Sequence, residues 1–509
     1  MTSPTATPAP SRLRWLQLAI LCVSVLLIGM DATILNAALP ALVRDLGADA
    51  TQQLWIVDAY ALVLSGLLVT AGALGDRWGR KKLLLTGFAL FGLASALVVV
   101  ADGPAALIAV RALLGVGGAA IMPSTLSMIR TAFTDTRERT VAVGIWSAMA
   151  AGGMAAGPLV GGLLMEHFDW HAAFLVNVPV VLIALIAGAL WLTESTGRAH
   201  AGLDAPSVAL SMAGVIALVF GVKQIGKAGI GAPSTLLALA AGAALLTWFA
   251  RRQLRLDEPL LDVRLFTNRT FSAAAVAILL TMATEAIVLF LLTQHFQMAQ
   301  GLSAFDAGVR LLPMTLALLA AAPAASALIH RLGMRTVIVG ALATVALGAL
   351  LLGLLVDRGY VPVAGALVLL GAGGGAMFTA SSVTLMAAVR PEQAGGAAAV
   401  DEMSFELGGA LGIAVLGSLA AALFRGAVTT DSHGLPAHAA EAARESLAGA
   451  LSAAERLPQD GAHLAQAAKT AFTDSFATTS LVSAGVMAAV TVLAALLVPR
   501  AFTPANHSG

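Results

Sequence analysis

The chain has 509 residues, of which 59% are hydrophobic and only 11% are charged, and its mean hydropathy is +0.89. Soluble domains carry about 25% charged residues, so this composition predicts a polytopic membrane protein. Twenty-nine basic residues nearly balance 28 acidic ones, and the net charge of +1 gives no reason to expect a nucleic-acid partner. A single cysteine, Cys22, excludes an internal disulfide and a cysteine metal cluster.

Long apolar runs alternate with short polar connections along the whole chain. A polar tail at 1–14 precedes the first run, which lacks a cleavage site at signal-peptide distance, so we expect a first helix there. Arg and Lys are concentrated in alternate connections and at both ends, which predicts cytoplasmic termini. Each run is close to the ~20 residues that cross a bilayer. The runs lie at about 15–38, 53–74, 83–101, 105–129, 140–165, 172–192, 206–222, 233–250, 271–293, 307–329, 335–356, 361–388, 396–424 and 475–498.

A dense block of charge, GALGDRWGRKK at 72–82, separates the second and third runs. Such a block cannot lie in hydrocarbon, so it predicts a short loop at the cytoplasmic face, with glycines that permit a tight turn. The block also resembles the loop signature of the major facilitator superfamily, G-x-L-x-D-R-x-G-R-[RK]. That resemblance implies a gating loop that latches the inner end of the transporter, formed by Gly72, Gly75, Asp76, Arg77, Gly79 and Arg80.

Three internal echoes divide the chain into two related parts. LLGVGGAAIMPSTLSM (113–128) recurs as LLGAGGGAMFTASSVTLM (369–386), GGMAAGPLVGGL (152–163) as GGALGIAVLGSL (408–419), and RWGRK as RLGMR. The offset is about 255 residues each time, which pairs Gly115 with Gly371, Gly153 with Gly409 and Gly79 with Gly333. We therefore predict fourteen transmembrane helices arranged as 6+2+6 with two pseudo-symmetric halves, and the resemblance implies that this is an all-α major facilitator fold.

The predicted domain boundaries follow from these echoes. They are a tail at 1–14, an N-terminal half at 15–200, a two-helix insert at 201–265, a C-terminal half at 266–498 and a tail at 499–509. The C-terminal half contains an external loop at 425–474, for which a solvated insertion is favoured over a lid.

Acidic residues inside the predicted helices are the main pointer to a binding site. A charged side chain at a helix centre costs roughly 2.5–3.5 kcal/mol on insertion scales, so it indicates function. The candidate substrate- and proton-binding residues are Asp31, Asp58, Glu285, Asp401, Glu402 and Glu406. Because a carboxyl group can hold a proton or a cation but hardly both, these residues provide a physical basis for exchange.

The repeat offset pairs two of these acids. Asp31 and Glu285 are separated by 254 residues, so we expect them to face each other across a central cavity. The alternative is that each acid pairs with a buried base and only stabilises packing, although Arg111 is the only base deep in a predicted helix. Glu402 and Glu406 share one helix face, from which Asp401 is turned by about 100°.

Two further motifs resemble signatures of the same superfamily. RALLGVG (111–117) resembles its fourth-helix signature, which implies a role for Arg111 in proton coupling. AGGMAAGPLVGG (151–162) resembles its fifth-helix antiporter signature, which favours export. The antiporter-motif residues are Gly153, Gly157, Pro158, Gly161 and Gly162.

The resemblance extends over nearly the whole chain. MDATILNAALP (30–40), LWIVDAYALVLSG (54–66) and AVDEMSFELGGALGIAVLGS (399–418) resemble the fourteen-helix drug:proton antiporters. Asp58 and the acids at 401–406 resemble the branch that exports quaternary ammonium compounds. This implies proton-coupled efflux of lipophilic cationic drugs by a multi-pass protein of a bacterial cell membrane.

Alternatives to this function remain open. One is a dedicated exporter of an endogenous antibiotic or natural product, and another is a proton-linked nutrient importer. An integral membrane enzyme is less favoured, because no nucleophile–base constellation stands out. Without a P-loop or an H-E-x-x-H motif, we expect no ATP dependence, no metal and no cofactor. The expected partners are small-molecule drugs, protons and the lipid bilayer, and we expect a monomer.

Overall fold

The computed structural model describes residues 11–48, 50–195, 204–256, 259–390, 393–431, 443, 446–457 and 461–498. All regular secondary structure over these residues is helical. Fourteen helical segments among them are long and apolar enough to cross a membrane, the number that the apolar runs predict. The predicted all-α architecture is therefore confirmed.

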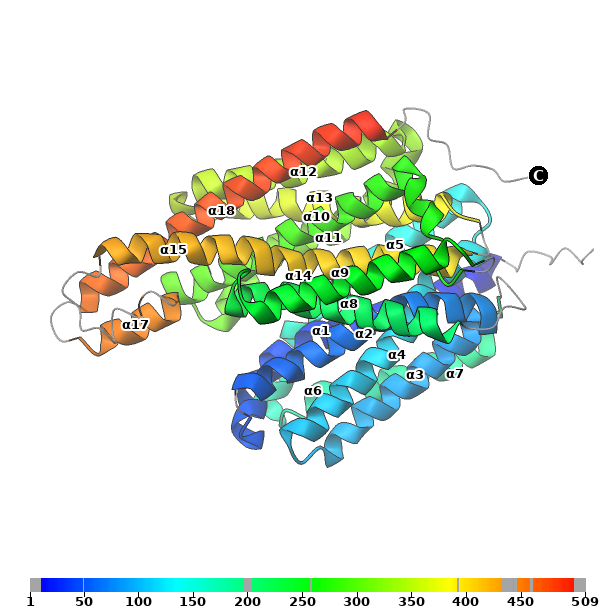
Figure 1. Ribbon diagram of the computed structural model, residues 1–509, viewed down its shortest axis with the longest axis horizontal. Helices are drawn as coiled ribbons and strands as arrows, with labels where there is room; N and C mark the ends of the chain where they lie inside the picture. The colour runs from blue at the N-terminus through cyan, green and yellow to red at the C-terminus, as the bar shows by residue number, and fades with distance from the viewer. Residues whose placement is uncertain are drawn as a thin grey trace, which may run out of the picture.

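The N-terminal half is a bundle followed by the two helices of the insert (Figure 1). The half comprises α1 (Ser11–Leu46), α2 (Ala50–Trp78), α3 (Arg80–Leu97), η1 (Val98–Val100), α4 (Pro104–Ala132), α5 (Thr136–His167), α6 (Ala172–Leu175) and α7 (Asn177–Trp191). The insert comprises α8 (Ala205–Ala228) and α9 (Pro233–Gln253), and the one-turn η2 (Val263–Thr267) follows it.

The C-terminal half repeats this plan with longer outer segments. It comprises α10 (Arg269–Gln294), η3 (His295–Ala299), α11 (Ala304–Leu332), α12 (Met334–Leu355), η4 (Val356–Arg358), α13 (Tyr360–Ala387), α14 (Ala394–Leu411), η6 (Gly412–Leu416), α15 (Gly417–Asp431), α17 (Leu447–Glu455) and α18 (Gly461–Leu497). Within the predicted external loop at 425–474, the described residues are helical in α15, α17 and α18.

Single glycines make the corresponding turns of the two halves. Gly79 joins α2 to α3 with φ 120°, and Gly333 joins α11 to α12 with φ 82°. A side chain disfavours this left-handed region, so glycine is the residue that fits. The turn also corrects a prediction: residues 72–78 are not loop but the last turns of α2, since Gly79 alone reverses the chain.

Glycine contacts confirm that α4 and α13 correspond. A Cβ at Gly115 would lie 2.7 Å from Tyr60 O on α2, and one at Gly371 would overlap Met314 O on α11. Because each glycine admits the backbone of the neighbouring second helix, the pairing of Gly115 with Gly371 holds in space as well as in sequence.

The corresponding contacts of α5 and α14 shift one predicted pair. A Cβ at Gly153 would overlap Leu26 O on α1, and one at Gly408 would overlap Leu279 O on α10. A Cβ at Gly409 would instead lie 4.0 Å from Ala286 Cβ, which is an ordinary van der Waals distance. Gly408, rather than Gly409, is therefore the counterpart of Gly153, because helix contacts select the residue that faces the neighbour.

The halves meet along α2–α14 and α5–α11, and α8 packs against α2. In Figure 1 the start of α1 and the end of α18 lie at the same end of the bundle, and α17 lies at the opposite end. Toward the α17 end, the blue and cyan helices diverge from α15 and α18. The end that holds the chain's first and last described turns is called the terminal end below.

Candidate functional site

Asp31 forms a fully buried ion pair at the centre of the N-terminal half. Its side chain is 0% exposed, and Oδ2 accepts a hydrogen bond of 3.1 Å from Nη1 of Arg111, which is 2% exposed. Oδ1 accepts a second bond of 2.8 Å from Nδ2 of Asn177. Three helices, α1, α4 and α7, therefore meet at one carboxylate. Arg111 is further held by donating from Nε to the Ile56 carbonyl at 3.1 Å.

This arrangement bears on both predictions made for Asp31. The acid does have a buried basic partner, so part of its role is to satisfy a charge that is costly inside a membrane. Asn177 was not predicted as a site residue. Its position in FLVNVP at the start of α7, a polar residue followed by an apolar run, was the available signal.

The glycines of the antiporter motif bring α5 against α1 beside Asp31. A Cβ at Gly157 would overlap Thr33 Oγ1 and lie 2.8 Å from Met30 O. Thr33 also donates to the Met154 carbonyl of α5 at 2.9 Å. Gly161 is buried, whereas Gly162 is exposed with no atom within 4 Å of a built Cβ. Only part of the motif thus makes the close helix contact, and the side chain of Pro158 lies outside the described residues.

Glu285 lies at a corresponding depth in α10 but in different surroundings. It is 5% exposed, and Oε1 has no hydrogen-bond partner among the described residues. The carboxyl group packs on Gly374 of α13, where a Cβ would overlap Oε1. By the register that pairs Gly115 with Gly371, the counterpart of Arg111 is Leu367, so no arginine stands at that place.

The structure does not bring Asp31 and Glu285 face to face. Gly157 packs on Met30 of α1, and its counterpart Gly412 packs on Ala283 of α10, so Asp31 corresponds to Thr284. Glu285 lies one residue further on and is turned by about 100°. Each carboxyl group contacts residues of its own half. The expectation that the two acids face each other is therefore wrong, because the true register differs from the predicted one by one residue.

The acids of α14 lie close together but face different neighbours. Asp401 is buried and accepts hydrogen bonds from Ser382 Oγ and, at 3.5 Å, from Ser381 Oγ of α13. Glu402 is buried and lies within electrostatic range of Glu406 and Asp401. Asp401 therefore lies on the face of α14 that meets α13, whereas Glu402 lies on another face near Glu406, as the predicted angle of about 100° between them requires. The backbone of Asp58 lies in α2, and its side chain lies outside the described residues.

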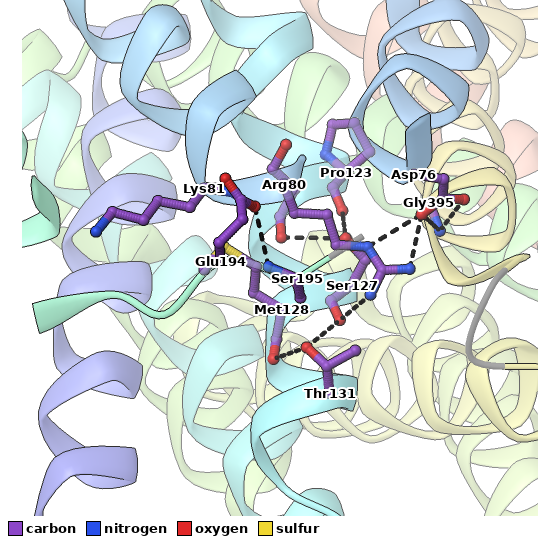
Figure 2. A network of polar contacts seen from close by, with 11 residues as sticks. Asp76, Arg80, Lys81, Pro123, Ser127, Met128, Thr131, Glu194, Ser195 and Gly395 are labelled. Carbon is purple, nitrogen blue, oxygen red and sulfur yellow. Dashed lines mark hydrogen bonds and ion pairs between the residues drawn. The ribbon is translucent and has the colours of Figure 1, made fainter. Parts of the chain in front are cut away.

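The predicted gating residues join the two halves at the terminal end. Asp76 accepts hydrogen bonds from Arg80 Nε at 3.0 Å and Nη2 at 2.7 Å, and from the N–H of Gly395 at 3.1 Å (Figure 2). Gly395 is near the start of α14, so the carboxylate lies at a helix N-terminus, where negative charge is favourable. Gly72 admits the backbone of Gly395 directly.

A second carboxylate holds the start of α3 next to this contact. Glu194 accepts from the backbone N–H groups of Lys81 at 3.0 Å and Lys82 at 3.2 Å. Figure 2 shows Glu194 beside Lys81 and Ser195. Gly75 accepts the N–H of Gly79 at 3.1 Å and faces Leu83. Free amides of the first helical turn are thereby satisfied. Glu194 was not predicted, because it lies 113 residues away in sequence from Lys81.

The connector from α9 to α10 also reaches the gating residues. Leu260 and Leu261 are buried, and they line a small pocket with Asp76 and Arg77. Their backbone N–H groups donate to Oε1 of Gln253, at 2.6 Å from Leu260. The two-helix insert is therefore tied to the junction of the halves, which the sequence alone did not indicate.

Other contacts between the halves lie on the same helices. Ser326 of α11 donates to the Thr140 carbonyl of α5 at 2.8 Å, and Arg130 donates to the Val389 carbonyl. Trp146 of α5 stacks on Phe378 of α13, with ring centroids 5.7 Å apart. Thr140, Ser326 and Arg130 all lie in the helix turns next to the terminal end, so the halves are closed there.

These features describe a helical membrane transporter with two related halves and a buried ion pair. A family model for the Major Facilitator Superfamily matches residues 21–413, and the chain belongs to this superfamily of transporters. Among the described residues, no group of three or more His, Cys, Asp or Glu side chains is placed to hold a metal ion.

Relatives match over almost the full length. The chain is 40% identical to the "Multidrug efflux pump LfrA" of Mycolicibacterium smegmatis, with 97% of each chain covered. It is 37% identical to the "Methyl viologen resistance protein SmvA" of Salmonella typhimurium, covering 93% of this chain and 96% of that protein. The crystal structure of the human organic anion transporter MFSD10 is similar in fold, with a TM-score of 0.61 at 15% identity, covering 94% of this chain and all of that one.

Proposed function

We propose that this protein exports lipophilic cationic small molecules from the cell in exchange for protons, by alternating access. The observation that carries the proposal is the buried Asp31–Arg111–Asn177 cluster within three membrane helices. Export is supported by the name of the relative LfrA, a multidrug efflux pump. Cationic cargo is supported by the name of SmvA, because methyl viologen is a dication.

The proton step acts through the ion pair. A proton on Asp31 removes the negative charge that pairs with Arg111 and weakens the hydrogen bond that Asn177 donates, so the common contact of the three helices is weakened. Because α1 packs on α5 through Gly157, and α5 packs on α11 of the other half, a shift at Asp31 has a contiguous route to the junction between the halves. Proton binding would in this way bias the rocking of the two halves.

Cargo binding is assigned to the remaining acids. Glu402 and Glu406 lie on a different face of α14 from the Asp401–Ser382 contact, and their carboxylates would attract a cation. Asp58 and Glu285 are included in the proposal on their sequence positions. In the family to which the chain belongs, substrate sites lie near the midplane between related halves, the place these residues would share.

The gating contact sets the direction of opening. With Asp76 bound to the start of α14, the terminal end is closed, and the site would open toward the other side. If both termini are cytoplasmic, as the distribution of Arg and Lys predicts, this corresponds to an outward-facing arrangement. The protein would then reside in the cell membrane of a bacterium as a monomer, with the insert α8–α9 at the edge of the junction.

A dedicated exporter of a natural product is the second candidate. It uses the same fold and the same proton step, so the two differ only in cargo range. Growth in a panel of monovalent and divalent cationic dyes separates them: a multidrug exporter protects against several unrelated cations, whereas a dedicated exporter protects against none or one.

Dye efflux from energised cells tests the proposal directly. Expression should accelerate loss of a cationic dye, and a protonophore should abolish the effect. Uptake of the dye driven by the same gradient would indicate an importer. If cells with and without the protein lose the dye at the same rate, cationic export is wrong.

A further inference from the structure

Tyr60 on α2 has a buried hydroxyl group that no structural role explains. The side chain is 4% exposed, and its hydroxyl has no hydrogen-bond partner among the described residues. Its ring lies under the guanidinium group of Arg111, with 4.6 Å from Cζ to the ring centroid. Buried hydroxyl groups are usually paired, so an unpaired one beside a functional ion pair points to a partner gained in another state.

The position of Tyr60 along α2 brings it level with the acids of α14. The two helices run in opposite directions and touch where Gly72 meets Gly395. Tyr60 lies twelve residues before Gly72, and Glu406 lies eleven residues after Gly395, so both are about 17 Å from this contact at 1.5 Å per residue.

Packing next to Tyr60 confirms this alignment. Leu62 belongs to an apolar cluster with Met403 and Leu407 of α14. These two residues are the sequence neighbours of Glu402 and Glu406. Helices α2, α8 and α14 therefore share an apolar cluster at this level, in addition to the contact near the gating residues.

The charged groups that act on the phenol come from three helices. Asp31 acts from α1, Arg111 from α4, and Glu402 and Glu406 from α14. Against α8, the neighbouring part of α2 presents apolar contacts, such as Leu62 with Val215 and Trp55 stacked on Phe220. Tyr60 is thus the side chain at which the ion pair of one half and the acid pair of the other act together.

We propose that Tyr60 is the positioning residue that links the Asp31–Arg111 pair to the cation-binding acids of α14. This role rests on the proposed proton-coupled export. The ring moves with Arg111, and when a proton on Asp31 releases the guanidinium group, the hydroxyl donates to Glu402 or Glu406. That hydrogen bond competes with a bound cation for the carboxylate oxygens, so proton binding in one half weakens cation binding in the other.

Thermodynamic linkage makes this proposal measurable, since protons and cargo must affect each other's affinity reciprocally. The test uses the purified full-length protein in lipid nanodiscs and the probe tetraphenylphosphonium, with affinity measured at pH 6 and pH 8. The variant Tyr60→Phe keeps the ring over Arg111 and removes only the hydroxyl. The matched control is Tyr360→Phe at the other tyrosine of the chain, whose hydroxyl donates to the Arg310 carbonyl.

We expect wild type and Tyr360→Phe to bind the probe about tenfold or more weakly at pH 6 than at pH 8, within the usual range of coupling between sites. Tyr60→Phe should bind at pH 8 as wild type does, with less than about threefold change at pH 6. Its thermal stability should match wild type, because the hydroxyl has no hydrogen bond to lose within the part of the chain that the structure describes.

Two other results overturn parts of this scheme separately. If wild type and Tyr60→Phe show the same tenfold dependence on pH, the role of Tyr60 is wrong and the proposed function stands. If wild type itself fails to bind the probe, or binds it equally at both pH values, the proposed proton–cation exchange is wrong, and the role of Tyr60 falls with it. A folded Tyr60→Leu variant, which also removes the ring, should lose pH dependence as well.

Discussion

Asp31 and Glu285 lie on corresponding helices of the two halves, but only Asp31 has a complete set of partners. Arg111 and Asn177 each donate to one oxygen of its carboxylate, whereas Glu285 packs on Gly374 and its Oε1 has no partner among the described residues. Leu367 stands where the first half has arginine. The comparison teaches that related halves share backbone contacts more strictly than polar chemistry. One half carries a fixed ion pair, and the other carries a carboxyl group that has no fixed counter-ion among the described residues.

The largest effect is expected at the ion pair itself. Asp31→Asn should abolish proton-driven dye efflux and destabilise the protein by about 3–5 kcal/mol, because it leaves the Arg111 charge buried without its counter-ion. Efflux from vesicles and thermal unfolding measure the two effects, with Glu285→Gln as the matched control in the other half. Undiminished efflux by Asp31→Asn would remove this residue from the mechanism.

A double-mutant cycle separates stability from transport. Arg111→Leu, which installs the residue of the second half, should destabilise the protein about as much as Asp31→Asn does. The double variant should recover most of that loss, because no unpaired charge remains buried, yet it should stay inactive. Additive losses of stability would show that the two residues do not act as a pair.

The glycine contact between α5 and α1 beside Asp31 gives a third, smaller effect. Gly157→Val should cost about 1–3 kcal/mol, because the new side chain would overlap Thr33 and push α5 away from α1. Gly162→Val, in the same motif, should change stability by less than about 0.5 kcal/mol, since nothing lies within 4 Å. Equal effects in an unfolding assay would mean that the motif does not act through this contact.

Glu285→Gln tests the incomplete site. Since Oε1 has no partner to lose among the described residues, stability should change by less than about 1 kcal/mol, and efflux should fall by less than about tenfold. Kinetic measurement of dye efflux with rising dye concentration distinguishes a change in affinity from a change in rate. Complete loss of efflux would place Glu285 on a par with Asp31 and end the contrast between the halves.

A partly exposed ion pair, Asp204–Arg252, provides the smallest effect and a contrast to Asp31. Hydrogen bonds from Arg252, at 2.8 and 2.9 Å, and from Ser207 hold the pKa of Asp204 below its ordinary value. A lowered pKa stabilises the folded state above the ordinary value near 3.9, and this contribution is lost as the pH falls below it.

Because solvent screens the Asp204–Arg252 pair, Asp204→Asn should barely move the unfolding temperature at pH 7. Comparison of melting curves for this variant and wild type at pH 7 and pH 3 is the measurement, and any small difference should shrink at pH 3, because its loss begins below the ordinary pKa and is complete only below the lowered one. A loss as large as that of Asp31→Asn would contradict the distinction between exposed and buried pairs.

The sequence predicted the fold more completely than it predicted the contacts of the candidate site. Fourteen apolar runs, the charged block and the glycine echoes follow from membrane thickness and local conformational freedom, which act within short segments. The register in which the helices pack could not be predicted to the residue. The counterpart of Gly153 is Gly408 and not Gly409, and the counterpart of Asp31 is Thr284 and not Glu285. A shift of one residue leaves hydropathy unchanged but turns a helical side chain by about 100°.

The sequence by itself determined that this chain is a helical membrane protein with acids inside its apolar segments, since composition and periodicity report solvent and secondary structure directly. The transporter class came from the resemblance of its motifs to those of a known superfamily. Only the tertiary structure decided which of the two acids has partners among the described residues. It also showed that Asn177, Glu194 and Tyr60 contact the predicted site residues or their neighbours. Partners more than a hundred residues apart, such as Asn177 and Asp31, meet because helices pack, and no local pattern in the sequence encodes that contact.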